Sequence, residues 1–130
     1  MATPTFSYTV DDERHLISMS LTGREDSVHY ADQIIAVYRE VPEVWRYNRL
    51  VDHRRFRGMI TFDDLRRMSE VWGDVTAGHD RVPKVAFLTR SALTQSRIVA
   101  HNEVFAQQHR RAFTNLAEAL DWVVEDETVV

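Results

Sequence analysis

The residues best suited to chemistry follow a short apolar stretch, in the run Asp52-His53-Arg54-Arg55-Phe56-Arg57. Arginine can bind a carboxylate or phosphate through two parallel N–H groups. A helix is expected to begin soon afterwards, with Thr61 at its N-terminus. The free N–H groups and the dipole of a helix N-terminus also favour negative charge. The run therefore predicts an anion site, provided that it forms a loop at the carboxyl edge of a sheet.

Arg90 and Ser91 open a further expected helix and would extend this site if the topology brings the two helix starts together. The candidate ligand- or partner-binding residues are then Asp52, His53, Arg54, Arg57, Thr61, Arg90 and Ser91. The alternative is a solvated loop whose arginines pair with Asp63, Asp64 or Glu70, which would leave no binding site.

Thr61 and Asp52 each have a structural and a functional interpretation. Thr61 precedes Asp64 by three positions, as in a capping box, so its hydroxyl is expected to accept a backbone N–H. The alternative is phosphorylation of that hydroxyl, which would add favourable charge at the helix N-terminus. Asp52 ends a strand at an expected crevice, where it is either a ligand group or the partner of an arginine or a loop amide.

Several classes of site lack the residues that they need. The sequence has no cysteine, which excludes disulfides, thiolate metal sites and cysteine nucleophiles. No two histidines have the i, i+4 spacing of helical zinc sites, so we predict no metal site. There is no Gly-x-Ser-x-Gly elbow, Walker loop or Gly-x-Gly-x-x-Gly motif, so we predict neither an enzyme nor a cofactor.

The bulk composition, 44% hydrophobic and 28% charged, is typical of a globular protein. Twenty acidic residues against sixteen basic ones argue against a nucleic-acid partner. The N-terminus lacks the pattern of a signal peptide, and no stretch is apolar for long enough to cross a bilayer. We therefore expect a cytoplasmic protein that does not insert into membranes, folded as a single domain over residues 1–130.

Hydrophobic periodicity predicts the order of the elements. Alternating residues predict strands over 5–10 and 15–22, joined as an antiparallel hairpin. Short apolar stretches without alternation predict buried strands over 49–52 and 85–88, and a short last strand is expected over 111–113. Helical spacing predicts helices over 27–41, from 61 to a stop at Gly78, over 91–108, and from a capping box at 115–118. Residues expected to face the core include Phe62, Leu65, Met68, Trp72 and Val75 in the second helix, and Leu93, Ile98, Asn102 and Phe105 in the third.

The predicted order is β-β-α-β-α-β-α-β-α. Alternation of strands and helices after an opening hairpin indicates an α/β fold, with a mixed, mostly parallel sheet of about five strands and helices on both faces.

These residues and spacings resemble the STAS domain of anti-sigma-factor antagonists, and more closely the small SpoIIAA-like bacterial proteins. The likeness extends over nearly the whole chain. Its features are Leu-Val-Asp52 at a strand end, Gly58 in the following connection, Phe-Asp-Asp-Leu opening a helix at 62–65, the Val-Ala-Phe-Leu strand at 85–88, and the closing strand and helix at 112–123.

One departure from the family pattern bears on function. Anti-sigma antagonists carry a phosphorylatable serine directly after the aspartate of the third strand. Here His53 follows Asp52, and no serine or threonine occurs before Thr61. The resemblance therefore implies the fold without the phosphoswitch, and it also implies kinship with a lipid-carrier fold that binds apolar ligands.

Two functions remain open from the sequence. The first is a non-enzymatic regulatory or scaffold module that acts by protein–protein contact, including self-association through a sheet edge. The second is binding of a small acidic or amphipathic, lipid-like molecule at the carboxyl edge of the sheet. Its apolar walls would come from Phe56, Met59 and Phe62, and its charge from Arg54, Arg57 and Arg90.

Overall fold

The computed structural model describes residues 5–101 and 107–124, without the side chains of residues 92 and 98–101. The elements follow the predicted order, with one added 3-10 turn, η1. They are β1 (Thr5–Asp11), β2 (Leu16–Arg24), α1 (Ser27–Glu40), η1 (Val44–Arg46), β3 (Asn48–Arg57), α2 (Phe62–Val75), β4 (Lys84–Leu88), α3 (Ala92–His101), β5 (His109–Phe113) and α4 (Leu116–Val124).

The five described strands form one mixed sheet in the order β1-β2-β3-β4-β5. β1 and β2 are an antiparallel hairpin, and the other neighbouring pairs are parallel. The predicted α/β class and the opening hairpin are thus confirmed. Because β2, β3 and β4 are parallel, their carboxyl ends lie at one edge of the sheet, and the helices that follow them begin there.

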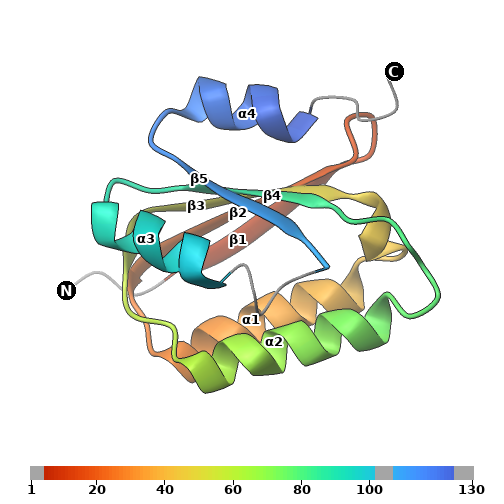
Figure 1. Cartoon of the computed structure of the whole chain (residues 1–130), viewed down its shortest axis with the longest axis horizontal. Coiled ribbons are helices and arrows are strands. Elements are labelled where there is room, and N and C mark those ends of the chain that lie inside the picture. Colours follow the sequence, from red (N-terminus) through yellow and green to blue (C-terminus); the bar gives the residue numbers. More distant parts are fainter. Residues whose placement is uncertain (1–4, 102–106, 125–130) are drawn as a thin grey trace.

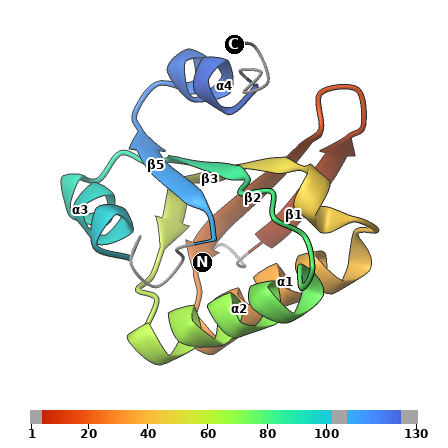
Figure 2. The same ribbon diagram turned by 45° about the vertical axis from the view of Figure 1, so that its right-hand side comes forward.

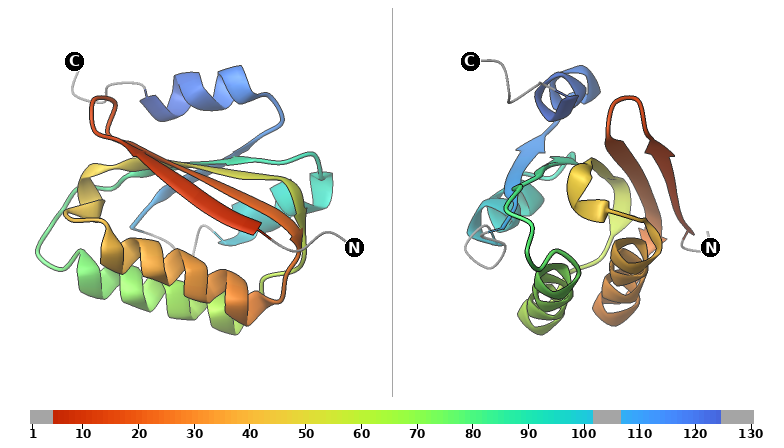
Figure 3. Two further views of the ribbon diagram at one scale, coloured as in Figure 1. Left: turned by 180° about the vertical axis from the view of Figure 1, so that it is seen from behind. Right: turned by 90° about the vertical axis from the view of Figure 1, so that its right-hand side faces the viewer.

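Helices cover both faces of the sheet (Figure 1). α1 and α2 lie side by side under one face, and α4 lies over the other, as the turned view also shows (Figure 2). α3 packs along β5, on the same side as α1 and α2 (Figure 3). The face toward α1, α2 and α3 is called the three-helix face below, and the other the α4 face.

Each face has its own buried apolar cluster. On the three-helix face, Ile17, Met19 and Leu21 of β2 pack against α1 and α2 residues such as Ile34 and Trp72. On the α4 face, the cluster consists of Leu16, Leu50, Ala86, Leu88, Phe113, Ala119 and Val123. Successive residues of each strand point to opposite faces, so one strand supplies both clusters.

Side-chain caps fix the helix starts. Asp26 Oδ1 accepts from His29 N at 2.8 Å at the start of α1. Thr61 Oγ1 accepts from Asp64 N at 3.2 Å and donates to Asp64 Oδ2 at 3.1 Å. Asn115 Oδ1 accepts from the amide N–H of Glu118 at 3.1 Å, at the start of α4. The predicted caps at Thr61 and Asn115 are confirmed, but the Asp64 carboxylate accepts from the Thr61 hydroxyl and not from the Thr61 N–H as a capping-box glutamate would.

The prediction that residues 53–57 form a loop is wrong. β3 continues to Arg57, because the end of β2 pairs with it: Thr22 lies opposite Arg55, and Arg24 lies opposite Arg57, after a register shift between Ser20 and Thr22. Backbone hydrogen bonding to a neighbouring strand outweighs the low strand propensity of a charged run.

The third helix and the last strand also differ from expectation. α3 is described to His101, and residues 107–108 form a turn and not the end of the predicted helix. β5 begins two residues earlier than predicted, at His109, whose N–H donates to Pro83 O at 2.9 Å. Leu93 and Phe62 were predicted to face the core, but they are 60% and 56% exposed. They lie at the N-terminal ends of α3 and α2. The predicted inward positions 102 and 105 lie outside the described residues, and the side chain of residue 98 is not described.

Candidate functional site

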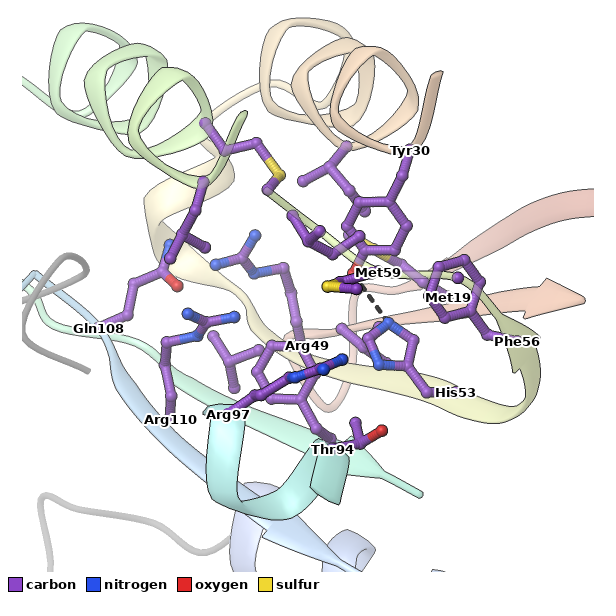
Figure 4. A pocket seen from close by; sticks show the side chains of 18 of the residues that line it. Met19, Tyr30, Arg49, His53, Phe56, Met59, Thr94, Arg97, Gln108 and Arg110 are labelled. Atoms are coloured by element: carbon purple, nitrogen blue, oxygen red, sulfur yellow. Dashed lines mark hydrogen bonds between the residues drawn. The ribbon is translucent and has the colours of Figure 1, made fainter. Parts of the chain in front are cut away.

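A pocket of about 90 Å³ lies on the three-helix face, between the sheet and the helices. Its floor is a row of side chains across the strands, since Arg49 of β3 lies opposite Val85 of β4, and Val85 lies opposite Arg110 of β5. Two arginines therefore flank a small apolar residue on the same face of the sheet. Arg97 of α3 also lines the pocket, and Figure 4 shows the guanidinium groups of Arg49 and Arg110 near one another, with that of Arg97 directed toward His53.

Arg49 is the most buried of these cations, with 2% of its surface exposed. Its guanidinium carbon lies 4.8 Å from the ring centre of Tyr38 and 4.7 Å from that of Trp72. Aromatic faces stabilise a cation without neutralising it. Among the described residues, Nε and Nη2 of Arg49 have no hydrogen-bond partner. These two nitrogens form one edge of the guanidinium, which matches the two oxygens of a carboxylate or phosphate.

Arg110 keeps its charge in a similar environment. Its guanidinium carbon lies 4.5 Å from the ring centre of Phe87. Burial is the largest cause that lowers the pKa of Arg110 to about 10, and the neighbouring Arg49 lowers it further. A group with that pKa remains protonated at neutral pH. The pocket therefore holds at least two buried cations that are close enough to affect one another.

His53 and Tyr30 form a neutral polar pair in the pocket wall. Tyr30 Oη lies 2.8 Å from His53 Nε2. Burial lowers the pKa of His53 to about 4, with a smaller contribution from Arg110, and burial raises the pKa of Tyr30. In the tautomer in which Tyr30 donates to Nε2, the proton is on Nδ1, and Nδ1 has no partner among the described residues. The amide nitrogen of Gln108, which also lines the pocket, has none either.

The described lining contains no aspartate or glutamate. Apart from the cations and polar groups already named and Thr94, it is apolar, with Met19, Tyr30, Ile34, Tyr38, Val51, Phe56, Gly58, Met59, Ile60, Leu65, Met68, Val85 and Phe87. Met59 is 60% exposed, so the pocket reaches the surface beside it. The arrangement suits a molecule with a negatively charged end and an apolar remainder.

Gly58 allows the chain to turn tightly at the pocket wall. A Cβ atom at this position would lie 2.7 Å from the carbonyl oxygen of Glu25 and 2.8 Å from the ring of Phe56. Both distances are shorter than van der Waals contact, so a larger residue would displace the Phe56 ring or the β2 connection. The glycine thereby positions Phe56 against Tyr30 and His53, at ring-centre distances of 5.2 Å from each.

The structure separates the site residues that the sequence predicted. His53 is the only one of them among the described pocket-lining residues. Asp52 points to the opposite face and pairs with Arg54, whose Nη2 lies 2.9 Å from Asp52 Oδ2. Arg57 and Arg90 are exposed. The pairing of Asp52 with Arg54 is the structural interpretation of Asp52. Burial raises the pKa of the Asp52 carboxyl and the hydrogen bonds from Arg54 lower it, and the net effect is a lowered pKa.

Thr61 and Ser91 serve as helix caps in the structure. Thr61 N also donates to Ser27 Oγ at 2.8 Å, which ties the start of α2 to the start of α1. Ser91 Oγ accepts from Thr94 N at 3.2 Å at the start of α3. Both hydroxyl oxygens are thus engaged with backbone N–H groups.

Over the described residues, no group of three histidine, aspartate or glutamate side chains is placed to hold a metal ion.

Sequence reasoning missed Arg49, Arg97 and Arg110. A signal existed for Arg49, because Arg49, Val51 and His53 alternate with Leu50 and Asp52, and all five residues belong to one strand. Arg110 lay just before the strand as it was predicted, and Arg97 lay within a helix with no other mark of function. Only the sheet register shows that Arg49 and Arg110 lie near one another, and the packing of α3 along β5 brings Arg97 to the same pocket.

The search of protein-family models found no match, and neither did the search of curated proteins. Among solved structures, the chain is similar to an uncharacterised protein of the DUF3478 family from Shewanella loihica PV-4, described as having a SpoIIAA-like fold. The two share 14% sequence identity with a TM-score of 0.60, over 95% of this chain and 97% of that one. The chain therefore has a SpoIIAA-like fold, as the sequence resemblance predicted.

At this level of identity the comparison establishes the fold alone. Within the described residues, no helix is both long enough and apolar enough to cross a membrane.

Proposed function

We propose that this protein binds a small amphipathic anion, with its acidic group held by the pocket arginines and its apolar part against the aromatic and aliphatic walls. The observation that carries the proposal is Arg49, a nearly fully buried cation with two free donor nitrogens in a described lining without a carboxylate. An unpaired charge in a protein interior is costly, and a bound anion would offset that cost.

The size of the pocket limits the buried part of the ligand. A water molecule needs roughly 10–15 Å³ of such volume, so about 90 Å³ is room for several waters or for an acidic group with the carbon atoms next to it. The remainder would leave through the opening at Met59. A fatty acid or an alkyl phosphate has this form, whereas an inorganic anion would leave the apolar walls unused.

The test is a calorimetric titration with octanoate, octyl phosphate and octanol, which share a chain and differ in the head group. Binding of the two anions, with octanol weaker by tenfold or more, is expected from the loss of about 1.5–3 kcal/mol in hydrogen bonds to charged groups. Equal binding of octanol, or no binding of either anion, would overturn the proposal.

Variants locate the binding. Arg49→Met and Arg97→Gln are expected to weaken octanoate binding strongly, whereas Arg46→Gln, an exposed arginine on η1, is the matched control and should bind as the unaltered protein does. Glu103→Gln controls for neutralisation of the arginines by a carboxylate from residues 102–106, which the structure does not describe. Tighter binding by that variant than by the unaltered protein would argue against a site built for an external anion.

A second candidate function is a regulatory or scaffold module that acts by protein contact. It is supported by β1, which stands last in the sheet order and has a partner strand on one side only among the described strands. An exposed strand edge can pair with another chain. Sedimentation over a wide concentration range tests it: a dimer lost on Thr9→Pro substitution in β1 supports the module, and a monomer at every concentration opposes it.

A further inference from the structure

The carboxyl edge of the sheet carries exposed apolar side chains that the pocket alone does not explain. Val28 is 57% exposed, Met59 60%, Phe62 56% and Leu93 60%. They lie at or just before the starts of α1, α2 and α3, and Figure 1 shows these three starts at one side of the molecule. We call these four side chains the apolar rim.

The apolar rim lies at the end of the molecule where the pocket opens. Met59 lines the pocket itself, and Leu93 adjoins Thr94, which lines it from α3. Val28 belongs to the same end, because its carbonyl oxygen accepts from Arg67 Nη2 of α2 at 3.2 Å. Large apolar residues that gather in this way on a protein surface mark an interaction site.

The charge around the rim identifies the kind of partner. Residues 24–28, 52–67 and 89–93 contain seven arginines and five acidic residues, whereas the whole chain has a net charge of −4. The arginines are Arg24, Arg54, Arg55, Arg57, Arg66, Arg67 and Arg90. Of the acids, Glu25 and Asp64 are buried. Arg54 pairs with Asp52, and Arg67 pairs with Asp64 and with Asp32 of α1. The other arginines of the set are exposed and outnumber the exposed aspartates Asp26 and Asp63, so the exposed charge at this end is net positive on an acidic protein.

Exposed apolar side chains with arginines at the same end of the molecule are the composition of a surface that lies on an anionic membrane, since the apolar groups enter the lipid and the cations meet the head groups. We propose that the apolar rim docks this protein on the surface of a bilayer rich in anionic lipid, with the pocket opening toward that surface. This inference deepens the proposed function, because it names the membrane as the source or destination of the amphipathic anion.

The test is co-sedimentation with vesicles of phosphatidylcholine alone and of phosphatidylcholine mixed equally with phosphatidylglycerol. Binding to the mixed vesicles only, and its decline at high salt, are expected because the attraction is between exposed charges. Absence of binding to the mixed vesicles would overturn the inference, as would equal binding to both kinds.

Substitutions at the rim test its position. Phe62→Ser combined with Leu93→Ser is expected to weaken partitioning roughly tenfold, because the exposed apolar area that would enter the lipid is lost. Arg55→Gln combined with Arg90→Gln is expected to have a similar effect at low salt, about fivefold for each charge. Leu116→Ser, which removes an apolar side chain that is 41% exposed on α4, is the matched control. A rim variant that binds like this control would contradict the proposal.

The two proposals can fail separately. Arg49→Met removes an interior cation and leaves the rim intact, so it should keep vesicle binding and lose octanoate binding. The double variant of Phe62 and Leu93, neither of which lines the pocket, should keep binding to octanoate in solution. If the unaltered protein binds octanoate but not the mixed vesicles, the docking inference alone is overturned. If it binds the mixed vesicles but not octanoate, the proposed function alone is overturned.

Discussion

The two faces of one strand, β3, have opposite character. Leu50 faces α4 and joins a buried apolar cluster. The buried polar groups on this face have partners, since Asn48 Nδ2 donates to the carbonyl oxygen of Val123 and Lys84 Nζ to that of Trp122. Arg49 and His53, neighbours of Leu50 in the strand, face the other helices and place a cation and an imidazole in the interior. The same backbone thus supports a closed hydrophobic core on one side and a pocket lined with hydrogen-bond donors on the other. Hydrophobic residues of similar volume are often the more stable choice at buried charged positions, so the polar face points to a function other than stability.

Truncation on the α4 face should have the largest effect on folding. Leu88 is 0% exposed, and Leu88→Ala would remove buried methyl groups and leave a cavity. The expected loss is about 3–4 kcal/mol in the free energy of unfolding. Urea unfolding measures it, and octanoate binding by the folded fraction should be unchanged. A loss below about 1 kcal/mol would show that this face is not a tightly packed core.

Acid should destabilise the pocket face through His53. Its pKa is about 4 in the folded protein, below the ordinary value of 6.5, so the unfolded chain binds more protons between those values. Stability should therefore fall by roughly 3 kcal/mol as the pH drops from 6.5 to 4. Burial raises the pKa of Glu25, so its protonation in acid favours the folded protein and partly offsets the effect of His53. The contribution of His53 is therefore measured by comparing the protein with variants.

His53→Gln isolates this contribution. Unfolding by urea at a series of pH values should show a flatter acid limb for His53→Gln than for the unaltered protein, and His109→Gln, at an exposed position, should retain the steep limb. If the curves of all three proteins are parallel between pH 6.5 and 4, the folded pKa of His53 is not depressed.

Arg49→Met should reverse the usual sign of a core mutation. The change removes a cation that has no carboxylate beside it among the described residues and fills the same space with an apolar side chain, at the loss of two cation–aromatic contacts. We expect the ligand-free protein to gain about 1–2 kcal/mol, together with the loss of octanoate binding. Thermal and urea unfolding measure the first effect. Marked destabilisation would mean that Arg49 is a structural residue.

The smallest effect should come from the residues that the sequence first suggested. Arg54 pairs with Asp52 at a partly exposed position, and such pairs contribute little. Arg54→Gln is expected to change stability by less than about 1 kcal/mol and octanoate affinity not at all. Titration of this variant beside Arg97→Gln compares the two sets of arginines directly, and a loss confined to Arg54→Gln would restore the site at residues 52–57.

Much of the fold was predictable because its signals are local. The hairpin follows from alternation, the helix starts follow from Asp26, Thr61 and Asn115, and the element order follows from periodicity. The extension of β3 was not predictable in the same way. It depends on pairing with the end of β2, a contact between distant parts of the chain, and the basic composition of residues 53–57 favoured a loop.

The pocket depends on still longer-range relations. Arg49 and Arg110 meet because both lie opposite Val85 in the parallel register, and no pattern in either segment reveals that register. The chemistry that the sequence suggested, an arginine-rich site for an acidic amphiphile, is also the chemistry that we propose for the pocket. The residues differ, since the arginines of residues 54–57 and Arg90 are exposed and the pocket arginines are buried or partly buried.

A crystal structure of the protein grown with octanoate would test the central claim most directly. The account predicts the carboxylate between Arg49 and Arg110, with its two oxygens accepting from Nε and Nη2 of Arg49 and its chain directed toward Met59. Octanoate bound only outside this pocket, or a pocket that stays without it at saturating concentration, would contradict the account.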